Sequence, residues 1–246
     1  MNVTKDGLKN RQLHIDDYLQ MVSAEQKEYA EVFAHQRITE NNDIITDFQT
    51  DNLMEQILHK DNLNKAYKKV KSNKGAGGID GMSVEELLGY LRNNQEQLIQ
   101  KLKDGKYKPN PVRRVEIPKE TKGEFRKLGV PTVVDRVFQQ AITQVLSPIY
   151  EKQFSENSFG FRPNRGAHDA LKQCQTNVND GYVYVVDMDL EKFFDTVCQS
   201  KLIEVLSRTI KDGRVISLIH KYLNAGVISR GIFEKTEVGM PQGGPL

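Results

Sequence analysis

The 246-residue sequence has few of the residues that build metal clusters, disulfide frameworks or membrane spans. Its two cysteines, Cys174 and Cys198, and its five histidines do not show the spacing of a metal site. Such sparing use of cysteine fits a reducing, cytoplasmic setting. The sequence shows no signal peptide and no long apolar run, so we expect no membrane segment. Internal repeats and low-complexity tracts are also missing.

The charge is small in total and unevenly spread. The net charge is +2 and 38% of the residues are hydrophobic, as in an ordinary soluble protein. Residues 1–60 carry six basic against eleven acidic residues, whereas residues 101–127 carry ten basic against four acidic residues. A basic segment in a nearly neutral chain indicates a polyanionic partner that is met at one place, and a solvated charged surface is the plain alternative.

Two carboxylates stand out in the stretch Tyr182–Asp195. Tyr, Val and Leu dominate its first part, which follows the turn pair Asp180-Gly181, so we expect a buried β-strand there. Alternation of side chains places Asp187 and Asp189 on one face, near the end of this strand. A buried carboxylate is costly unless it is paired or bound to a metal. A metal site is therefore one interpretation, and a hydrogen bond to a neighbouring loop is the other.

Most of the remaining sequence has the helical period. Helices are expected at residues 24–37, 84–103, 135–150, 167–178, 200–210 and 214–224. Two further helices are expected to start at residue 53, after a cap at Asp51 or Asn52, and at residue 63, after a cap at Asp61 or Asn62. Ser83 and Glu86 have the spacing of a capping box at the start of the helix that ends near Lys103. The polar, acidic residues 1–50 are expected to form a loosely attached N-terminal extension.

Two segments have the pattern of β-hairpins. The first pairs residues 113–117 with 125–130 and is rich in Lys and Arg, and the second spans residues 228–238. A basic hairpin suits phosphate binding, because arginine can hold phosphate oxygens through two hydrogen bonds. The glycine-rich stretch Lys74–Gly81 lacks the Gly-Lys-Ser/Thr ending of a phosphate-binding loop, so we expect a turn there.

Six blocks, in order, carry a resemblance to a known family. They are Asn73–Ala76 with Gly78–Gly81, Lys108-Pro109 with Pro111 and Arg113–Lys119, Arg126 with Leu128–Thr132, Gly160–Pro163, Asp189–Asp195, and Pro241–Leu246. Over residues 52–246 the sequence resembles the reverse transcriptases encoded by group II introns, the intron maturases. Residues 1–50 lie outside the resemblance.

The resemblance implies an α+β, right-hand polymerase (reverse transcriptase) fold. Mostly helical fingers with a basic β-hairpin would occupy residues 51–180, and a partial antiparallel palm sheet would occupy residues 181–246, after the N-terminal extension 1–50. The family's Tyr-Ala-Asp-Asp strand would lie beyond residue 246. We therefore expect that the 246-residue chain alone does not polymerise.

The resemblance also implies roles for individual residues. Asp189 matches the first catalytic aspartate, which binds both Mg²⁺ ions of a two-metal site, and the backbone carbonyl of Leu190 would bind one of them. Asp187 matches no metal ligand of the family, so the two-metal site is incomplete in this chain. Lys119 and Arg126 match a pair that holds the triphosphate. Phe194 matches the aromatic residue that selects deoxynucleotides, with Phe193 as the core residue of the pair.

Further matches concern the nucleic acid. Gln242 would position the template and the incoming nucleotide, and Gly243 would let the backbone approach the nucleic acid. Arg113 and Arg114 are expected on the basic hairpin as nucleic-acid contacts. The expected nucleic-acid-binding residues are thus Arg113, Arg114, Arg162, Arg165 and Gly243. For Arg162 and Arg165, a phosphate contact and a structural role as a loop brace explain the sequence equally well.

The function implied is RNA-directed DNA synthesis by a group II intron protein that also assists splicing and acts in retrohoming. Its partners would be the intron RNA, an RNA template with a DNA primer, and deoxynucleoside triphosphates, in the bacterial cytoplasm and with a homodimer as one option. A non-catalytic RNA-binding splicing factor is an alternative, because basic helices and a basic hairpin can grip structured RNA. A retron or diversity-generating reverse transcriptase is another.

Overall fold

The computed structural model describes residues 52–119 and 123–246. All helices and strands named below belong to one unit, Ile45–Leu246. The helix expected at 24–37 and the N-terminal extension lie outside the described residues. Among the described helices, none combines the length and apolarity needed to cross a membrane.

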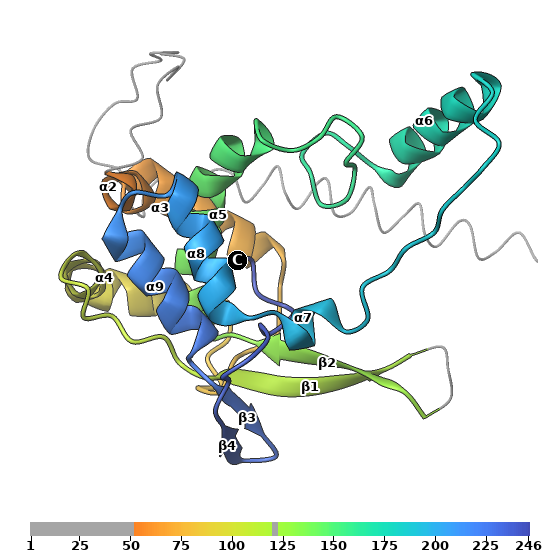
Figure 1. Ribbon diagram of the computed structural model, residues 1–246. Coiled ribbons are helices and arrows are strands. Elements are labelled where there is room, and N and C mark those ends of the chain that lie inside the picture. Colours follow the sequence, from red (N-terminus) through yellow and green to blue (C-terminus); the bar gives the residue numbers. More distant parts are fainter. Residues whose placement is uncertain (1–51, 120–122) are drawn as a thin grey trace, which may run out of the picture. The chain divides into compact units, whose positions relative to one another are not determined.

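Helices dominate the described chain, with one small sheet (Figure 1). The elements are α2 (Leu53–Ile57), α3 (Lys60–Ser72), α4 (Leu87–Lys103), β1 (Val112–Pro118), β2 (Phe125–Val130), α5 (Val133–Glu151), α6 (Ala167–Asn179), α7 (Phe193–Thr196), α8 (Gln199–Thr209), α9 (Gly213–Leu223), β3 (Val227–Ser229) and β4 (Ile232–Glu234). The α+β class and both hairpins are confirmed. The helices expected between residues 53 and 224 are also confirmed, with ends within a few residues of the expected ones.

The core lies where α3 packs along α5. One stripe of α3 is buried, formed by Leu63, Ala66, Tyr67 and Val70 at helical spacing. Helix α3 begins at Lys60, earlier than expected, so Asn62 does not cap it. Instead the Asn62 amide donates to the carbonyls of Ile57 and Ala141, at 2.9 and 3.0 Å, and so links α3 to α2 and α5.

Asp212 joins the start of α9 to the start of α2. Its carboxylate accepts hydrogen bonds from the backbone amides of Arg214 (3.0 Å) and Met54 (2.9 Å). The Arg214 guanidinium bridges the carboxylates of Asp212 and Glu55. Since the first amides of a helix have no partner within the helix, one buried side chain here satisfies a donor from each of two helices.

The sheet has the strand order β2-β1-β3-β4. Strands β1 and β2 pair antiparallel over their length, with Arg114 opposite Gly129 and Ile117 opposite Arg126. Strand β3 pairs parallel with β1 and antiparallel with β4, so the sheet is mixed. The basic hairpin expected from the sequence therefore continues into the C-terminal hairpin, which brings distant parts of the chain side by side.

The prediction of a β-strand at residues 182–190 is wrong. This segment has no regular secondary structure and runs as a connection between α6 and α7 (Figure 1). Its side chains are exposed, with 79% of the Val183 surface and 92% of the Tyr184 surface accessible. An apolar strand needs partner strands for its amides and cover for both faces, and no strand within residues 52–119 and 123–246 pairs with it.

Candidate active-site cleft

An open cleft of about 1240 Å³ lies between the β1–β2 hairpin, α7 and the segment after β4. Figure 1 shows α7 beside this hairpin. Six basic side chains line the cleft, namely Arg114, Lys119, Arg126, Lys127, Lys192 and Lys235, together with four acidic side chains, Asp189, Asp195, Glu234 and Glu237. Four phenylalanines, Phe125, Phe161, Phe193 and Phe194, lie among these charged groups. A basic groove with interleaved aromatic rings is suited to a nucleotide or a nucleic-acid strand.

This cleft collects most of the site residues expected from the sequence. Those that line it are Arg114, Lys119, Arg126, Asp189, Leu190, Phe194 and Gln242. They come from the hairpin, from the segment before α7 and from the last residues of the chain. Asp189 thus shares an open cleft with the basic hairpin, as the sequence interpretation requires. The chemical role of each residue stays a prediction.

The pair expected to hold the triphosphate, Lys119 and Arg126, lies on the distal part of the hairpin. The Lys119 ammonium is 3.0 Å from the Glu124 carboxylate, and both side chains are about half exposed. An ion pair at this exposure contributes little and exchanges readily with other partners. Lys119 can therefore turn to a phosphate at small cost. Arg126 also lines the cleft, and its planar guanidinium suits bidentate binding of phosphate oxygens.

The two neighbouring arginines of β1 point to different surroundings, as expected for alternating side chains. Arg114 lines the cleft. Arg113 donates from Nε and Nη2 to the carbonyl of Gly77, at 3.2 and 2.8 Å, and so braces the glycine-rich turn. Arg113 thus has an internal partner, and its expected contact with nucleic acid stays a prediction.

Asp189 lies in the extended segment that leads into α7. It lines the cleft with its neighbours Met188 and Leu190, whereas Asp187 is absent from the described lining. The Leu190 carbonyl accepts a 3.4 Å hydrogen bond from the Phe193 amide, which leaves it a second lone pair. Within the described residues, no three His, Cys, Asp or Glu side chains gather as a metal cluster. The Asp189 carboxylate and the Leu190 backbone carbonyl are oxygen donors of the kind that hard cations prefer. Such a cation would take its other ligands from phosphate and water.

Phe193 and Phe194 form an edge-to-face pair with ring centroids 5.6 Å apart. Both line the cleft, and their exposed fractions are similar, 47% and 44%. The expectation that Phe193 is the core residue of the pair is therefore wrong for the described chain. The segment before them, which would cover Phe193 if it formed a sheet, is extended and exposed.

The C-terminal segment connects the two walls of the cleft through its backbone. The Gly129 amide donates to the Gln242 carbonyl at 2.7 Å, and the Met240 amide donates to the Phe194 carbonyl at 2.7 Å. A Cβ atom on Gly129 would lie 2.8 Å from the Pro241 side chain, so only glycine permits this approach. Gly243 has φ +120°, a conformation that glycine adopts readily, and it is exposed.

Arg162 is a structural brace. It is only 8% exposed, and its guanidinium donates to the Glu151 carboxylate and to the carbonyls of Ser155 and Ser158. The hydrogen bonds from Arg162 lower the pKa of Glu151 below its usual value. Arg165 pairs with Glu156 and lies over the Phe159 ring. Both arginines fit the brace interpretation, and a phosphate contact by either stays a prediction.

Several lining residues were not assigned to the site from the sequence. They are Phe161, Lys127, Lys192, Asp195 and Lys235. Phe161 belongs to the Gly-Phe-Arg-Pro block that carries the resemblance, but the block does not specify the direction of its side chain. Lys192 adopts a left-handed conformation, φ +49°, just before α7. A side chain's direction at such a turn cannot be read from a strand or helix period.

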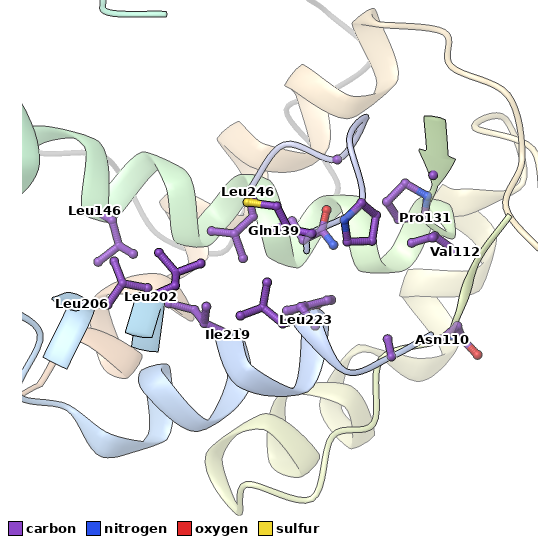
Figure 2. A pocket seen from close by; sticks show the side chains of 16 residues that line it. Asn110, Val112, Pro131, Gln139, Leu146, Leu202, Leu206, Ile219, Leu223 and Leu246 are labelled. Atoms are coloured by element: carbon purple, nitrogen blue, oxygen red, sulfur yellow. The ribbon is translucent and has the colours of Figure 1, made fainter. Parts of the chain in front are cut away.

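A second cavity, of about 220 Å³, has a different character. It lies between α5, α8, α9 and the C-terminal segment. Figure 2 shows Leu146, Leu202 and Leu206 together at one end of the cavity and Gln139 beside Leu246. Its lining is almost entirely apolar. It offers no cation for a phosphate, so it is not a candidate nucleotide site.

Comparisons with known proteins show the family to which the chain belongs. Residues 117–246, more than half of the chain, match the reverse transcriptase (RNA-dependent DNA polymerase) family. The group II intron-encoded protein LtrA of Lactococcus lactis subsp. cremoris is 36% identical over 211 residues, which are 86% of this chain and 35% of LtrA. Nuclear intron maturase 2 of Arabidopsis thaliana is 38% identical over 95 residues, 39% of this chain and 13% of that protein.

A solved structure described as a partial Cas6-RT-Cas1--Cas2 complex shares the fold, with a TM-score of 0.51 and 20% identity, over 86% of this chain and 35% of that one. The chain spans about a third of the length of LtrA. The expected resemblance to group II intron proteins is confirmed. The chain belongs to the reverse transcriptase (RNA-dependent DNA polymerase) family.

Proposed function

We propose that this chain forms the nucleotide- and template-binding cleft of an RNA-directed DNA polymerase encoded by a group II intron. The family match and the resemblance to LtrA support the reaction class. The observation that carries the proposal is the single cleft that unites Asp189, Lys119, Arg126, Phe194 and Gln242.

Each lining residue has a role that its chemistry supports. Lys119 and Arg126 bind the triphosphate from the hairpin side. Asp189 and Leu190 line the cleft, where the Asp189 carboxylate and the Leu190 carbonyl would supply oxygen ligands for Mg²⁺. Charge on the phosphates would be neutralised by the metal bound there. Phe194 lies beside the sugar, and Gln242 contacts the template and the incoming base.

The test is a titration of the full chain with a fluorescent deoxynucleoside triphosphate, in Mg²⁺ and with an RNA template and DNA primer. Arg126→Ala should weaken binding by roughly tenfold or more, because a charge-assisted pair to phosphate is lost. Arg92→Ala is the matched control, since Arg92 is exposed on α4 and is not among the described lining residues. Equal affinity for both variants and the unsubstituted chain would contradict the proposal.

Asp189 is tested in the same titration by varying Mg²⁺. Asp189→Asn should remove most of the increase in nucleotide affinity that Mg²⁺ produces, while binding in the absence of Mg²⁺ stays unchanged. The physical reason is that the amide keeps the shape of the side chain but loses the anionic ligand. A Mg²⁺ response equal to that of the unsubstituted chain would show that Asp189 does not hold the metal.

A second role, in intron splicing, has its own support. The name of the Arabidopsis thaliana relative is that of an intron maturase. Outside the cleft, the exposed face of α3 carries four lysines, Lys60, Lys65, Lys68 and Lys69. Such a face suits the phosphates of folded RNA. Replacing Lys65, Lys68 and Lys69 by alanine should weaken binding of intron RNA on filters and reduce its salt dependence, and an unchanged salt slope would count against this role.

Intron-encoded relatives favour the group II type over a retron or diversity-generating enzyme. Retrohoming, a homodimer and a bacterial cytoplasmic setting stay predictions. Cys174 and Cys198 are both free and exposed, which is compatible with a reducing compartment.

A further inference from the structure

Phe161 combines full exposure with an unfavourable backbone conformation. Its relative accessible surface is 111%, so no described part of the chain covers the ring. Its φ is +56°, in the left-handed region that bulky residues avoid. Exposing a phenyl ring gains nothing from burial, and the backbone conformation costs free energy as well. Neither feature is explained by the stability of the described fold.

The neighbours of Phe161 hold it in this position. Arg162, the next residue, is buried and is fixed by Glu151 and by the carbonyls of Ser155 and Ser158. The Arg162 guanidinium also lies over the Phe154 ring, 5.5 Å from its centroid. Arg162 is thus anchored inward directly after the exposed Phe161, and Pro163 further restricts the backbone of Arg162.

The direction of this exposure is specific, because Phe161 lines the same cleft as the basic hairpin. Arg126 and Lys127 provide cations on one side, and Lys192 provides another near α7. Cations that suit phosphates and a flat apolar ring that suits a base are the two parts of a single-strand binding surface.

We propose that Phe161 stacks on an unpaired base of the RNA strand held in the cleft. The inference rests on the proposed function, since it assumes that the cleft binds nucleic acid, and it adds a residue and a preference for unpaired bases. Bases inside a duplex have both faces covered by their neighbours, so only an unstacked base can lie on the ring. Stacking tolerates any base, because every base has a π-face.

The sequence contains no tryptophan, which allows a direct test. Phe161→Trp introduces a single tryptophan, which can be excited apart from the nine tyrosines and can itself stack, so the variant should bind a single-stranded RNA oligonucleotide within about twofold of the original affinity. Its fluorescence should be quenched by the RNA. The control is Leu171→Trp, an exposed position on α6 that is not among the described lining residues, and its fluorescence should not change.

A second variant separates stacking from folding. Phe161→Gly removes the ring and suits the positive φ, so its thermal stability should equal or exceed that of the unsubstituted chain. Its affinity for single-stranded RNA should fall about fivefold to a hundredfold, with an unchanged slope of affinity against salt, because no phosphate contact is lost. Arg126→Ala should instead reduce that slope.

The outcomes distinguish the two levels of the proposal. Suppose that the unsubstituted chain binds RNA with a strong salt dependence. If Phe161→Gly then binds equally well, or the fluorescence of the Phe161→Trp variant does not respond to RNA, the stacking inference is overturned while the proposed function stands. If the unsubstituted chain does not bind RNA, or binds it independently of salt, the proposed function fails and the stacking inference with it.

Discussion

Replacing Asp212 with alanine removes a side chain that satisfies two helix starts at once. Asp212 is 4% exposed and accepts the backbone amides of Arg214, at the start of α9, and of Met54, in α2. Alanine supplies no acceptor, and the site is closed to water on the Met54 side, where the hydrogen bond is buried. Arg214 retains Glu55 as a partner, so its charge is not left isolated.

The size of the loss follows from these contacts. Loss of a helix cap costs about 1 kcal/mol, and a buried amide left without an acceptor costs about 1–3 kcal/mol. Asp212→Ala should therefore lower the free energy of unfolding by about 2–4 kcal/mol, a large share of the roughly 5–15 kcal/mol of a typical domain. Asp212→Asn keeps one acceptor oxygen and should cost about half as much.

The loss should depend on pH. Burial alone raises the pKa of Asp212, but the hydrogen bonds from Arg214 and the Met54 amide outweigh it, and the pKa lies below its usual value. A carboxyl group with a lowered pKa stabilises the fold above its unfolded pKa of about 4, and this contribution disappears as the pH falls through the folded pKa. The difference in stability between the original chain and Asp212→Asn should thus be constant near neutral pH and shrink below about pH 4.

Denaturation in guanidinium chloride, followed by circular dichroism near neutral pH and again below about pH 4, measures this difference. Asp61→Ala is the control, because the Asp61 side chain is 75% exposed and its removal should change stability by less than about 0.5 kcal/mol. If Asp212→Ala loses no more than this control, or the Asp212→Asn difference does not shrink in acid, the reasoning about this carboxylate is refuted.

Three further predictions concern the walls of the two cavities and the buried network beside them. Gln139→Leu should raise the stability by about 1 kcal/mol, because the Gln139 Oε1 is buried without a hydrogen-bond partner among the described residues, and a lower melting temperature would contradict this. Gly129→Ala should lower the free energy of unfolding by about 1–3 kcal/mol and weaken nucleotide binding. The new methyl group would lie 2.6 Å from the Val112 side chain and displace Pro241. Unchanged affinity in the nucleotide titration would refute the connection between this contact and the cleft. Asp135→Asn should lower the free energy of unfolding by about 1–3 kcal/mol in chemical denaturation. The buried carboxylate accepts hydrogen bonds from the hydroxyl groups of Tyr107 and Thr132, each at 2.7 Å, and the single oxygen of an amide cannot accept from all of these donors. A loss below about 0.5 kcal/mol would contradict this prediction.

The sequence predicts those parts of the fold whose cause is local. The stripe of α3, the reciprocal hydrogen bonds of Ser83 and Glu86 and the pairing of β1 with β2 each depend on residues close in the chain. Helix α4 itself begins at Leu87, later than the expected cap at Ser83. The segment 182–190 has an equally clear pattern, yet it forms no strand, because a strand depends on a partner that its own residues do not specify. The parallel pairing of β1 with β3 was likewise not predicted, since it joins Val112 to Val227.

In the site, too, the sequence predicts which types of residue are present but not where their side chains point. The sequence identifies arginines as hydrogen-bond donors suited to anions, but it does not say which acceptor each one meets. Arg114 faces the cleft, Arg113 binds the Gly77 carbonyl, and Arg162 binds Glu151. The partners of the last two are a carbonyl of a turn and a carboxylate of the preceding helix, and both contacts arise only when the loops are folded.

The motifs that carry the family resemblance therefore serve two physical purposes. Gly129 lies in one block and Gln242 in another, far along the chain, and a single hydrogen bond between their backbones joins the hairpin to the C-terminal segment. The glycine is needed there because any side chain would collide with Val112 and Pro241. Gly129 thus holds the walls of the cleft together, while charged and aromatic residues of these blocks such as Lys119, Arg126 and Phe194 line it. A substitution of the first kind should lower stability and binding together, whereas one of the second kind should lower binding alone.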